Sequence, residues 1–235
     1  MPLIPTGPDH QHHETFQNIN GAYKLYDRLE LTTTTGTINI EIDPQPGDKP
    51  AQLLLSTDTG SIRVRLSSAY LHRRHRAARA IDTNIRSLTG TVNAEILLGH
   101  GGNASVDTST GAQVLSVLTS GIGRHDEVSE LKTYSKTGSQ RLTLTSLHPE
   151  SELLTNLRAE HHSFVTAQLD IVYPRVWLGK VHATASLPGH LAVSGSDLEY
   201  VKQGTSEITA YRGPVKNRQT VDVVSHGTGN ANFQC

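Results

Sequence analysis

The chain has 235 residues, of which 35 % are hydrophobic, and this length can bury the core of one large β domain. Its formal net charge of −1 excludes the strong overall field that attracts nucleic acid or an anionic membrane surface. The single cysteine, Cys235, excludes a disulfide within the chain, and no segment approaches the roughly 20 consecutive apolar residues of a membrane helix.

Residues 1–18 are expected to form a flexible N-terminal tail. Prolines and glycines fill four of the first eight positions, and His10, His12 and His13 follow. Histidines in a flexible segment have no imposed geometry, so we predict neither a metal site nor a cofactor there or elsewhere. The segment lacks the basic and apolar regions of a secretory leader, which favours an intracellular location. A secreted or surface location is the alternative if the sequence is truncated.

Residues 19–235 are expected to form a single β-repeat domain. The repeated unit is a strand, a Thr-Gly turn and a second strand, first seen in LTTTTGTINIEI at 31–42. The five turn glycines, each preceded by a threonine, are Gly36, Gly60, Gly90, Gly111 and Gly138. Apolar residues at alternate positions after each turn predict strands with one buried face and one exposed face. In the fourth and fifth units, Gln113 and Gln140 take the first of these apolar positions.

Two topologies fit such units. In a parallel β-solenoid each unit is one coil stacked on the next, whereas in an antiparallel β-sandwich each unit is a hairpin. Aligned by the turn glycines, one outward position reads Glu41, Arg65 and Glu95, so opposite charges would meet on adjacent coils. We therefore predict an all-β chain built as a parallel β-solenoid, and the antiparallel β-sandwich is the alternative.

After residue 145 the repeat weakens. The sixth unit, HHSFVTAQL at 161–169, lacks its turn glycine, and the lone tryptophan follows a strand expected at 164–174. The order YPRVWLGKVHATASLPGHLAVSG, ITAYRG and VDVVSHGTGNANF resembles an uncharacterised adhesin-like domain of fungal proteins, related to an adhesin family of β-strand-repeat proteins of unknown function. The matching positions are Tyr173, Pro174, Trp177, Gly179, Gly189, Gly195 and Gly229. The resemblance covers residues 20–235 and implies a β-repeat fold with an adhesin-like role.

The candidate ligand-binding residues lie where the repeat is interrupted. The longest insertion, 67–84, gathers Arg73, Arg74, Arg76 and Arg79, a cluster that suits an anionic partner. Because few aromatic residues accompany these arginines, a solvated loop is favoured over a binding site. His161 and His162 replace the expected turn and could meet His182 or His190 on adjacent coils, but no motif places a carboxylate beside them, so no zinc site is predicted. Trp177 completes the set of candidates.

Three functional hypotheses follow. The favoured one is a non-catalytic binding module, adhesin-like, that recognises a glycan, a surface or a protein partner through loops on one edge of the stack. The alternative is a carbohydrate-active β-helix enzyme, a lyase or hydrolase, for which the sequence singles out no catalytic residue. The third is a structural protein that forms homo-oligomers through its end coils, unless residues 19–30 and the strand ending at Phe233 cap them.

Overall fold

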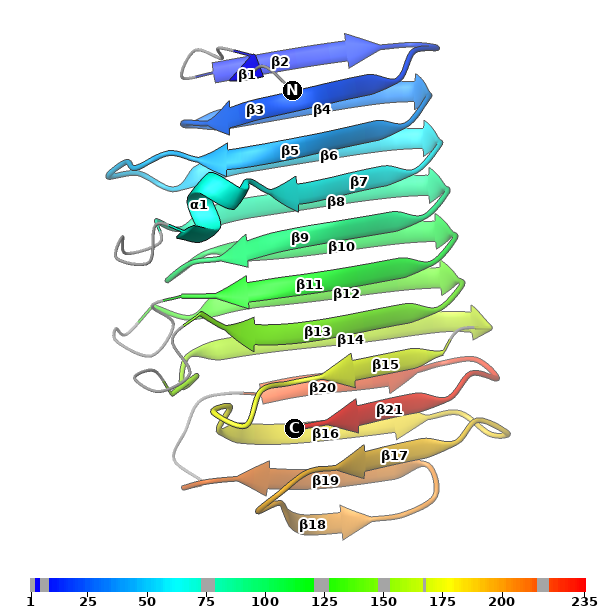
Figure 1. The fold of residues 1–235 in the computed structure, drawn as a ribbon. Coiled ribbons are helices and arrows are strands. Elements are labelled where there is room, and N and C mark those ends of the chain that lie inside the picture. The colour runs from blue at the N-terminus through cyan, green and yellow to red at the C-terminus, as the bar shows by residue number, and fades with distance from the viewer. Residues whose placement is uncertain are drawn as a thin grey trace.

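The computed structural model describes residues 3–4, 9–72, 79–120, 127–147, 153–166, 168–214 and 220–235. Two sheets, both rich in parallel pairs, contain nearly all of its regular structure, and the described residues form one short helix, α1 (Ser68–His72). Figure 1 shows the two sheets face to face, with the strands of each stacked along the long axis of the molecule. The all-β prediction is confirmed.

The chain alternates between the sheets along most of its length. In spatial order, sheet A comprises β1 (Leu3–Ile4), β3 (Ile19–Leu25), β5 (Ile38–Pro44), β7 (Ile62–Leu66), β9 (Val92–Leu98), β11 (Gln113–Thr119), β13 (Gln140–Ser146), β15 (Leu169–Val172), β21 (Ala231–Gln234) and β17 (Leu191–Ser194). Sheet B comprises β18 (Glu199–Gln203), β19 (Glu207–Arg212), β16 (Gly179–Ala185), β20 (Thr220–Ser225), β14 (Leu157–Thr166), β12 (Ser129–Thr137), β10 (Asn103–Thr110), β8 (Ile81–Thr89), β6 (Ala51–Thr59), β4 (Arg28–Thr35) and β2 (Asp9–Glu14).

The two strands of one repeat do not pair with each other. β4 pairs with β6 and β5 pairs with β7, in both cases in parallel. Within the described residues, antiparallel pairing is confined to β16 with β19 and β18 with β19. Parallel pairing between units is therefore confirmed, and the alternative of an antiparallel sandwich built from hairpins is wrong.

The register of the units is the one that the turn glycines predict. Thr35 lies opposite Thr59, and Thr59 lies opposite Thr89. A Cβ on Gly60, whose φ is +150°, would lie 1.9 Å from the carbonyl oxygen of Gly36. Stacked turns thus need glycine because the preceding turn's carbonyl occupies the space of a side chain.

The predicted charge ladder on sheet A is present only in part. Asn39 lies opposite Arg63 and Glu41 lies opposite Arg65, as the alignment requires. The Glu95 carboxylate, however, accepts a hydrogen bond from the backbone N–H of Leu66 at 3.0 Å. Glu95 therefore accepts a backbone hydrogen bond at the end of β7 and does not continue the charge ladder.

The core lies between the sheets, where aliphatic side chains such as Leu31 and Ile38 are fully buried. Beside them runs a buried column of hydroxyl side chains that the sequence did not reveal. Thr57 Oγ1 donates to the Gly36 carbonyl at 3.1 Å, and Ser87 Oγ donates to the Gly60 carbonyl at 3.2 Å. These inner hydroxyls give the carbonyls of the partly buried turn glycines a hydrogen-bond donor.

The strands do not follow sequence order at the C-terminal end. β20 lies between β14 and β16 in sheet B, and β21 lies between β15 and β17 in sheet A. Figure 1 shows this red segment sandwiched between yellow ones. Phe233 is consequently buried inside the stack, so the expectation that its strand caps an end is wrong. The edge strands at this end are β17 and β18, and the Tyr200 hydroxyl of β18 donates to the Val193 carbonyl of β17 at 2.9 Å.

The expected N-terminal tail also differs from the structure. Within residues 1–18, Asp9–Glu14 form β2, which pairs in parallel with β4 and is the edge strand of sheet B. Its histidines thus have a fixed backbone: the His10 ring contacts the Tyr23 ring at a centroid distance of 5.7 Å. The period-two alternation of this short polar segment is too weak to distinguish it from a loop.

Candidate functional site

Three of the four predicted arginines, Arg73, Arg74 and Arg76, lie outside the described residues. Arg79 is described, and its side chain is only 8 % exposed. Its guanidinium donates to the carbonyls of Tyr26 at 2.6 Å and Lys49 at 2.5 Å, and pairs with Asp27 at 2.9 Å. The structure corrects the expected ligand role of Arg79, because the residue joins two turns of the protein itself.

The structure also contradicts the predicted ligand-binding role of Trp177. Its side chain is fully buried, with its ring against Tyr173 at 5.8 Å and Phe233 at 5.6 Å between centroids. The three rings fill the core at the level where β21 enters the stack. The motif that carries the adhesin-like resemblance is therefore a packing motif in this region.

His161 and His162 point to opposite sides of β14, since successive residues of a strand alternate between its faces. His161 is fully buried: its Nδ1 lies 2.8 Å from Thr133 Oγ1 and its Nε2 lies 3.0 Å from the Tyr173 hydroxyl. Burial lowers the pKa of His161 to about 3, so the imidazole is neutral. Its predicted contact with a ligand is therefore wrong.

His162 lies on the outer face of sheet B, where its ring stacks with three others. Its centroid is 5.3 Å from that of Tyr134, 6.1 Å from that of Phe164 and 5.8 Å from that of His226. The rings of Phe164 and His226 also stack on each other at 5.1 Å. We call these four residues, Tyr134, His162, Phe164 and His226, the aromatic ladder. It crosses β12 and β14 and ends directly after β20.

The repeat is broken at β14, next to the ladder. Ser135 pairs with Ser163, but the next pair is Thr137 with Thr166, so two residues of β14 lie opposite Lys136 alone. Alternation along β14 already places Phe164 on the outer face, two residues after His162, and the one extra residue of the bulge adds Val165 beside it; these side chains are 43 % and 47 % exposed. The missing turn glycine of the sixth unit was the sequence signal of this irregularity.

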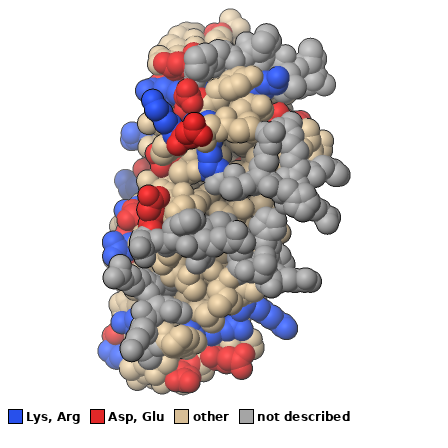
Figure 2. Space-filling model, turned by 90° about the vertical axis from the view of Figure 1, so that its left-hand side faces the viewer, with Lys and Arg blue, Asp and Glu red and all other residues tan. Residues whose placement is uncertain are grey.

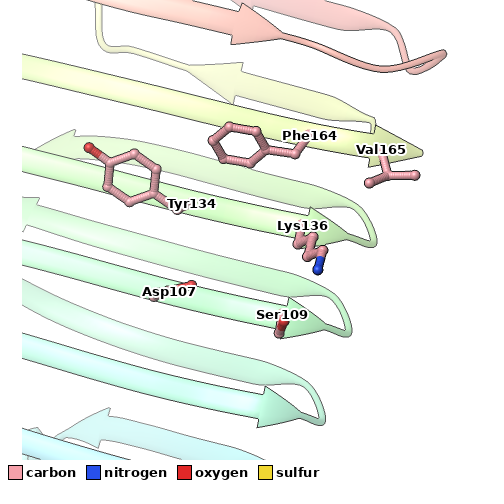
Figure 3. A pocket seen from close by; sticks show the side chains of 6 residues that line it. All are labelled: Asp107, Ser109, Tyr134, Lys136, Phe164 and Val165. Atoms are coloured by element: carbon pink, nitrogen blue, oxygen red, sulfur yellow. The ribbon is translucent and has the colours of Figure 1, made fainter.

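An open hollow lies beside the ladder, with a volume of about 440 Å³. Its lining residues are Asp107, Ser109, Tyr134, Lys136, Phe164 and Val165. Figure 3 shows both aromatic rings broadly face-on over the sheet, with Asp107 and Ser109 on the neighbouring strand β10. The volume lies within the range of about 300–1,000 Å³ that is typical of small-ligand sites. We call this the ladder hollow.

The ladder hollow combines apolar and polar walls. Phe164, Val165 and Tyr134 provide the apolar surface, while Asp107 offers a hydrogen-bond acceptor and Lys136 a donor. The Tyr134 hydroxyl donates to Glu160 Oε2 at 3.1 Å, and burial together with this bond raises the pKa of Tyr134. Burial and the neighbouring His226 lower the pKa of His162. Near pH 7 the ladder is therefore uncharged at both of these rings.

Other ionisable groups on sheet B pair with one another. His182 lies between two carboxylates, with Nδ1 3.3 Å from Asp222 and Nε2 3.5 Å from Glu207. Among the described residues no group of three or more His, Cys, Asp or Glu side chains is arranged to hold a metal ion, so the zinc alternative gains no support. In Figure 2, lysine and arginine residues are interspersed with acidic residues, mainly along the left edge and at the lower end of the view.

The described part of the chain contains no helix with the length and apolarity needed to cross a membrane. Comparisons with known protein families, with curated proteins and with solved structures found no match for this chain.

Proposed function

We propose that the chain is a β-solenoid binding module that recognises a glycan at the ladder hollow and the adjoining aromatic ladder. The observation that carries the proposal is the exposed pair Phe164 and Val165 at the bulge in β14, which lies next to Asp107 and Lys136. A sugar ring offers a C–H face that packs on an aromatic ring and hydroxyls that hydrogen-bond to charged groups. The resemblance to adhesin-like domains points in the same direction.

The shape of the surface favours an oligosaccharide over a single sugar. The ladder hollow and the ladder together extend from β10 across β12 and β14 to the end of β20, four neighbouring strands of sheet B. With strands about 4.8 Å apart, this surface is about 14 Å long. A chain of several sugar units lying across the strands would contact its whole length.

The proposal is tested with the full chain on an array of neutral, acidic and amino-sugar oligosaccharides. Hits are then titrated by calorimetry with wild type, Phe164→Ala and the control Phe16→Ala. Phe16 is 79 % exposed and lies between β2 and β3, at the other end of the sheets, so its loss should leave binding unchanged. Removing a ring at the centre of the surface should weaken binding by about tenfold or more. Equal affinities of both variants, or the absence of any saturable hit, would refute the proposal.

The alternative of a carbohydrate-active enzyme is distinguished in the same samples. A hydrolase or lyase would release new reducing or unsaturated ends from a bound oligosaccharide. We expect the oligosaccharides to remain intact after prolonged incubation. Cleavage that Asp107→Asn abolishes would replace the binding module by an enzyme acting at the ladder hollow.

A further inference from the structure

Two glutamines occupy inward positions where the other units carry aliphatic residues. Gln113 and Gln140 pair with each other across β11 and β13, and their neighbours in this column of sheet A are Val92 and Leu169. Both side chains are almost completely buried, at 0 % and 1 % exposure. Burying an amide in an aliphatic column is costly unless it forms hydrogen bonds, so these two positions call for a specific explanation.

Both amides reach across the core to the backbone of the aromatic ladder. Gln113 Nε2 donates to the carbonyl of Tyr134 at 2.6 Å, and Gln140 Nε2 donates to the carbonyl of His162 at 2.5 Å. These carbonyls belong to the two residues whose rings stack at 5.3 Å on the opposite side of sheet B. The only inward glutamines of the five regular units thus lie directly behind the ladder.

Each glutamine is itself held in place from within the core. Gln113 Nε2 also donates to Thr108 Oγ1 at 3.1 Å. Gln140 Oε1 accepts from Thr133 Oγ1 at 2.7 Å, and Thr133 Oγ1 is in turn 2.8 Å from His161 Nδ1. Both ends of the Gln140 amide are thus engaged, which fixes its orientation, whereas Gln113 is held through Nε2 alone and its Oε1 has no hydrogen-bond partner among the described residues.

We propose that Gln113 and Gln140 are positioning residues, which hold the backbone beneath Tyr134 and His162 and thereby set the ring stack that borders the ladder hollow. This inference rests on the proposed function of the ladder hollow as a ligand site. The need for such support is local: regular pairing between β12 and β14 stops after Ser135 and Ser163, one residue beyond the two carbonyls. Hydrogen bonds from the two core glutamines hold this part of the backbone where the bulge interrupts the pairing of β12 with β14.

The test uses Gln113→Met and Gln140→Met, because methionine keeps an unbranched side chain of similar length but has no amide. The matched control is Leu142→Met, an inward residue of β13 whose substitution leaves both glutamines in place. We expect each glutamine variant to bind the best oligosaccharide of the array about tenfold more weakly or worse. The control should bind as wild type does.

Two NMR readouts separate positioning from loss of stability and from failure of the proposed function. The ring-proton shifts of Tyr134 and His162 report the stack without any ligand, and they should move in the glutamine variants alone. The pKa of His162, which burial lowers, should rise toward its ordinary value in Gln140→Met. If Gln140→Met fails to fold, the ring-proton shifts of Tyr134 in Gln113→Met, compared with those of wild type, test the inference instead. Folded glutamine variants with wild-type ring shifts and His162 titration would overturn the inference, even if wild type binds no glycan.

Discussion

The fully buried His161 should make the stability of the protein depend steeply on pH. It lies in one hydrogen-bonded chain: the Tyr173 hydroxyl donates to Nε2, Nδ1–H donates to Thr133 Oγ1, and Thr133 donates to Gln140. The Thr133 hydroxyl donates its only hydrogen to Gln140, so it can only accept from His161. The neutral imidazole of His161 therefore carries its proton on Nδ1. The perturbation is His161→Gln, which keeps a donor and an acceptor but has no group that titrates in this range.

The magnitude follows from the pKa of His161, which burial lowers from 6.5 to about 3. Below pH 6.5 the unfolded chain takes up a proton at this residue, while the folded protein does so only near pH 3. The contribution is therefore complete above pH 6.5 and is lost as the pH falls toward 3. The limiting slope is about 1.4 kcal/mol per pH unit, which gives a loss of about 2 kcal/mol between pH 7 and pH 5.

The assay is urea unfolding at pH 7 and pH 5, followed by the fluorescence of Trp177, the single tryptophan, which is buried beside Tyr173. Wild type should lose about 2 kcal/mol more free energy of unfolding than His161→Gln between the two pH values. The other histidines, including His162, are present in both proteins, so their contributions cancel in the difference. An equal loss in the two proteins would refute the reasoning.

Three further predictions concern the scaffold and use thermal or urea unfolding. Gly60→Ala should lower the free energy of unfolding by about 2 kcal/mol or more, because φ is +150° and the new Cβ would meet the Gly36 carbonyl. The control is Gly204→Ala, whose new Cβ would lie 3.3 Å from the nearest atom, the Glu207 carbonyl oxygen, and which should destabilise the protein far less. Thr57→Val, which strips the Gly36 carbonyl of its donor, should cost about 1–3 kcal/mol, whereas Thr59→Val at an exposed position of the same strand should be nearly neutral. Arg79→Lys should lower the free energy of unfolding by about 1–3 kcal/mol, because it loses hydrogen bonds to the carbonyls of Tyr26 and Lys49. The control, Arg63→Lys at an exposed position, should change it very little, and equal losses in the two variants would contradict the bridging role of Arg79.

The repeat made the parallel pairing and its register predictable. A turn glycine and alternating apolar residues fix which side chains face inward, so the Asn39–Arg63 and Glu41–Arg65 pairs followed from alignment alone. The place of β21 was not predictable, because a strand of four residues carries no local signal that selects β15 and β17 as its neighbours. Local patterns determine faces, whereas the order of short strands depends on contacts between distant parts of the chain.

One residue of the candidate site was among those predicted from the sequence, and two more could have been found from the repeat alignment. His162 was among the candidates, but it was grouped with its neighbour His161, although alternation along a strand separates the two side chains. Asp107 and Tyr134 each stand four residues before a turn glycine, so the same alignment places them side by side on adjacent strands. The same alternation places Phe164 on the outer face with His162, whereas the exposure of Val165 was not predictable, because it depends on where the bulge falls within β14.

The position of β20 and β21 constrains the order in which the protein can assemble. Units up to β14 and β15 can each dock on the unit made before them, so growth along the stack can follow the chain. β16 and β17 cannot do so, because the slot beside β14 and β15 belongs to residues that come about 40 positions later in the sequence. Until these residues arrive, two strand edges stay open at the level of the aromatic ladder, and His226 is missing from it. We therefore expect the surface of the aromatic ladder to be completed last during folding, and a chain with an incomplete stack to lack part of it.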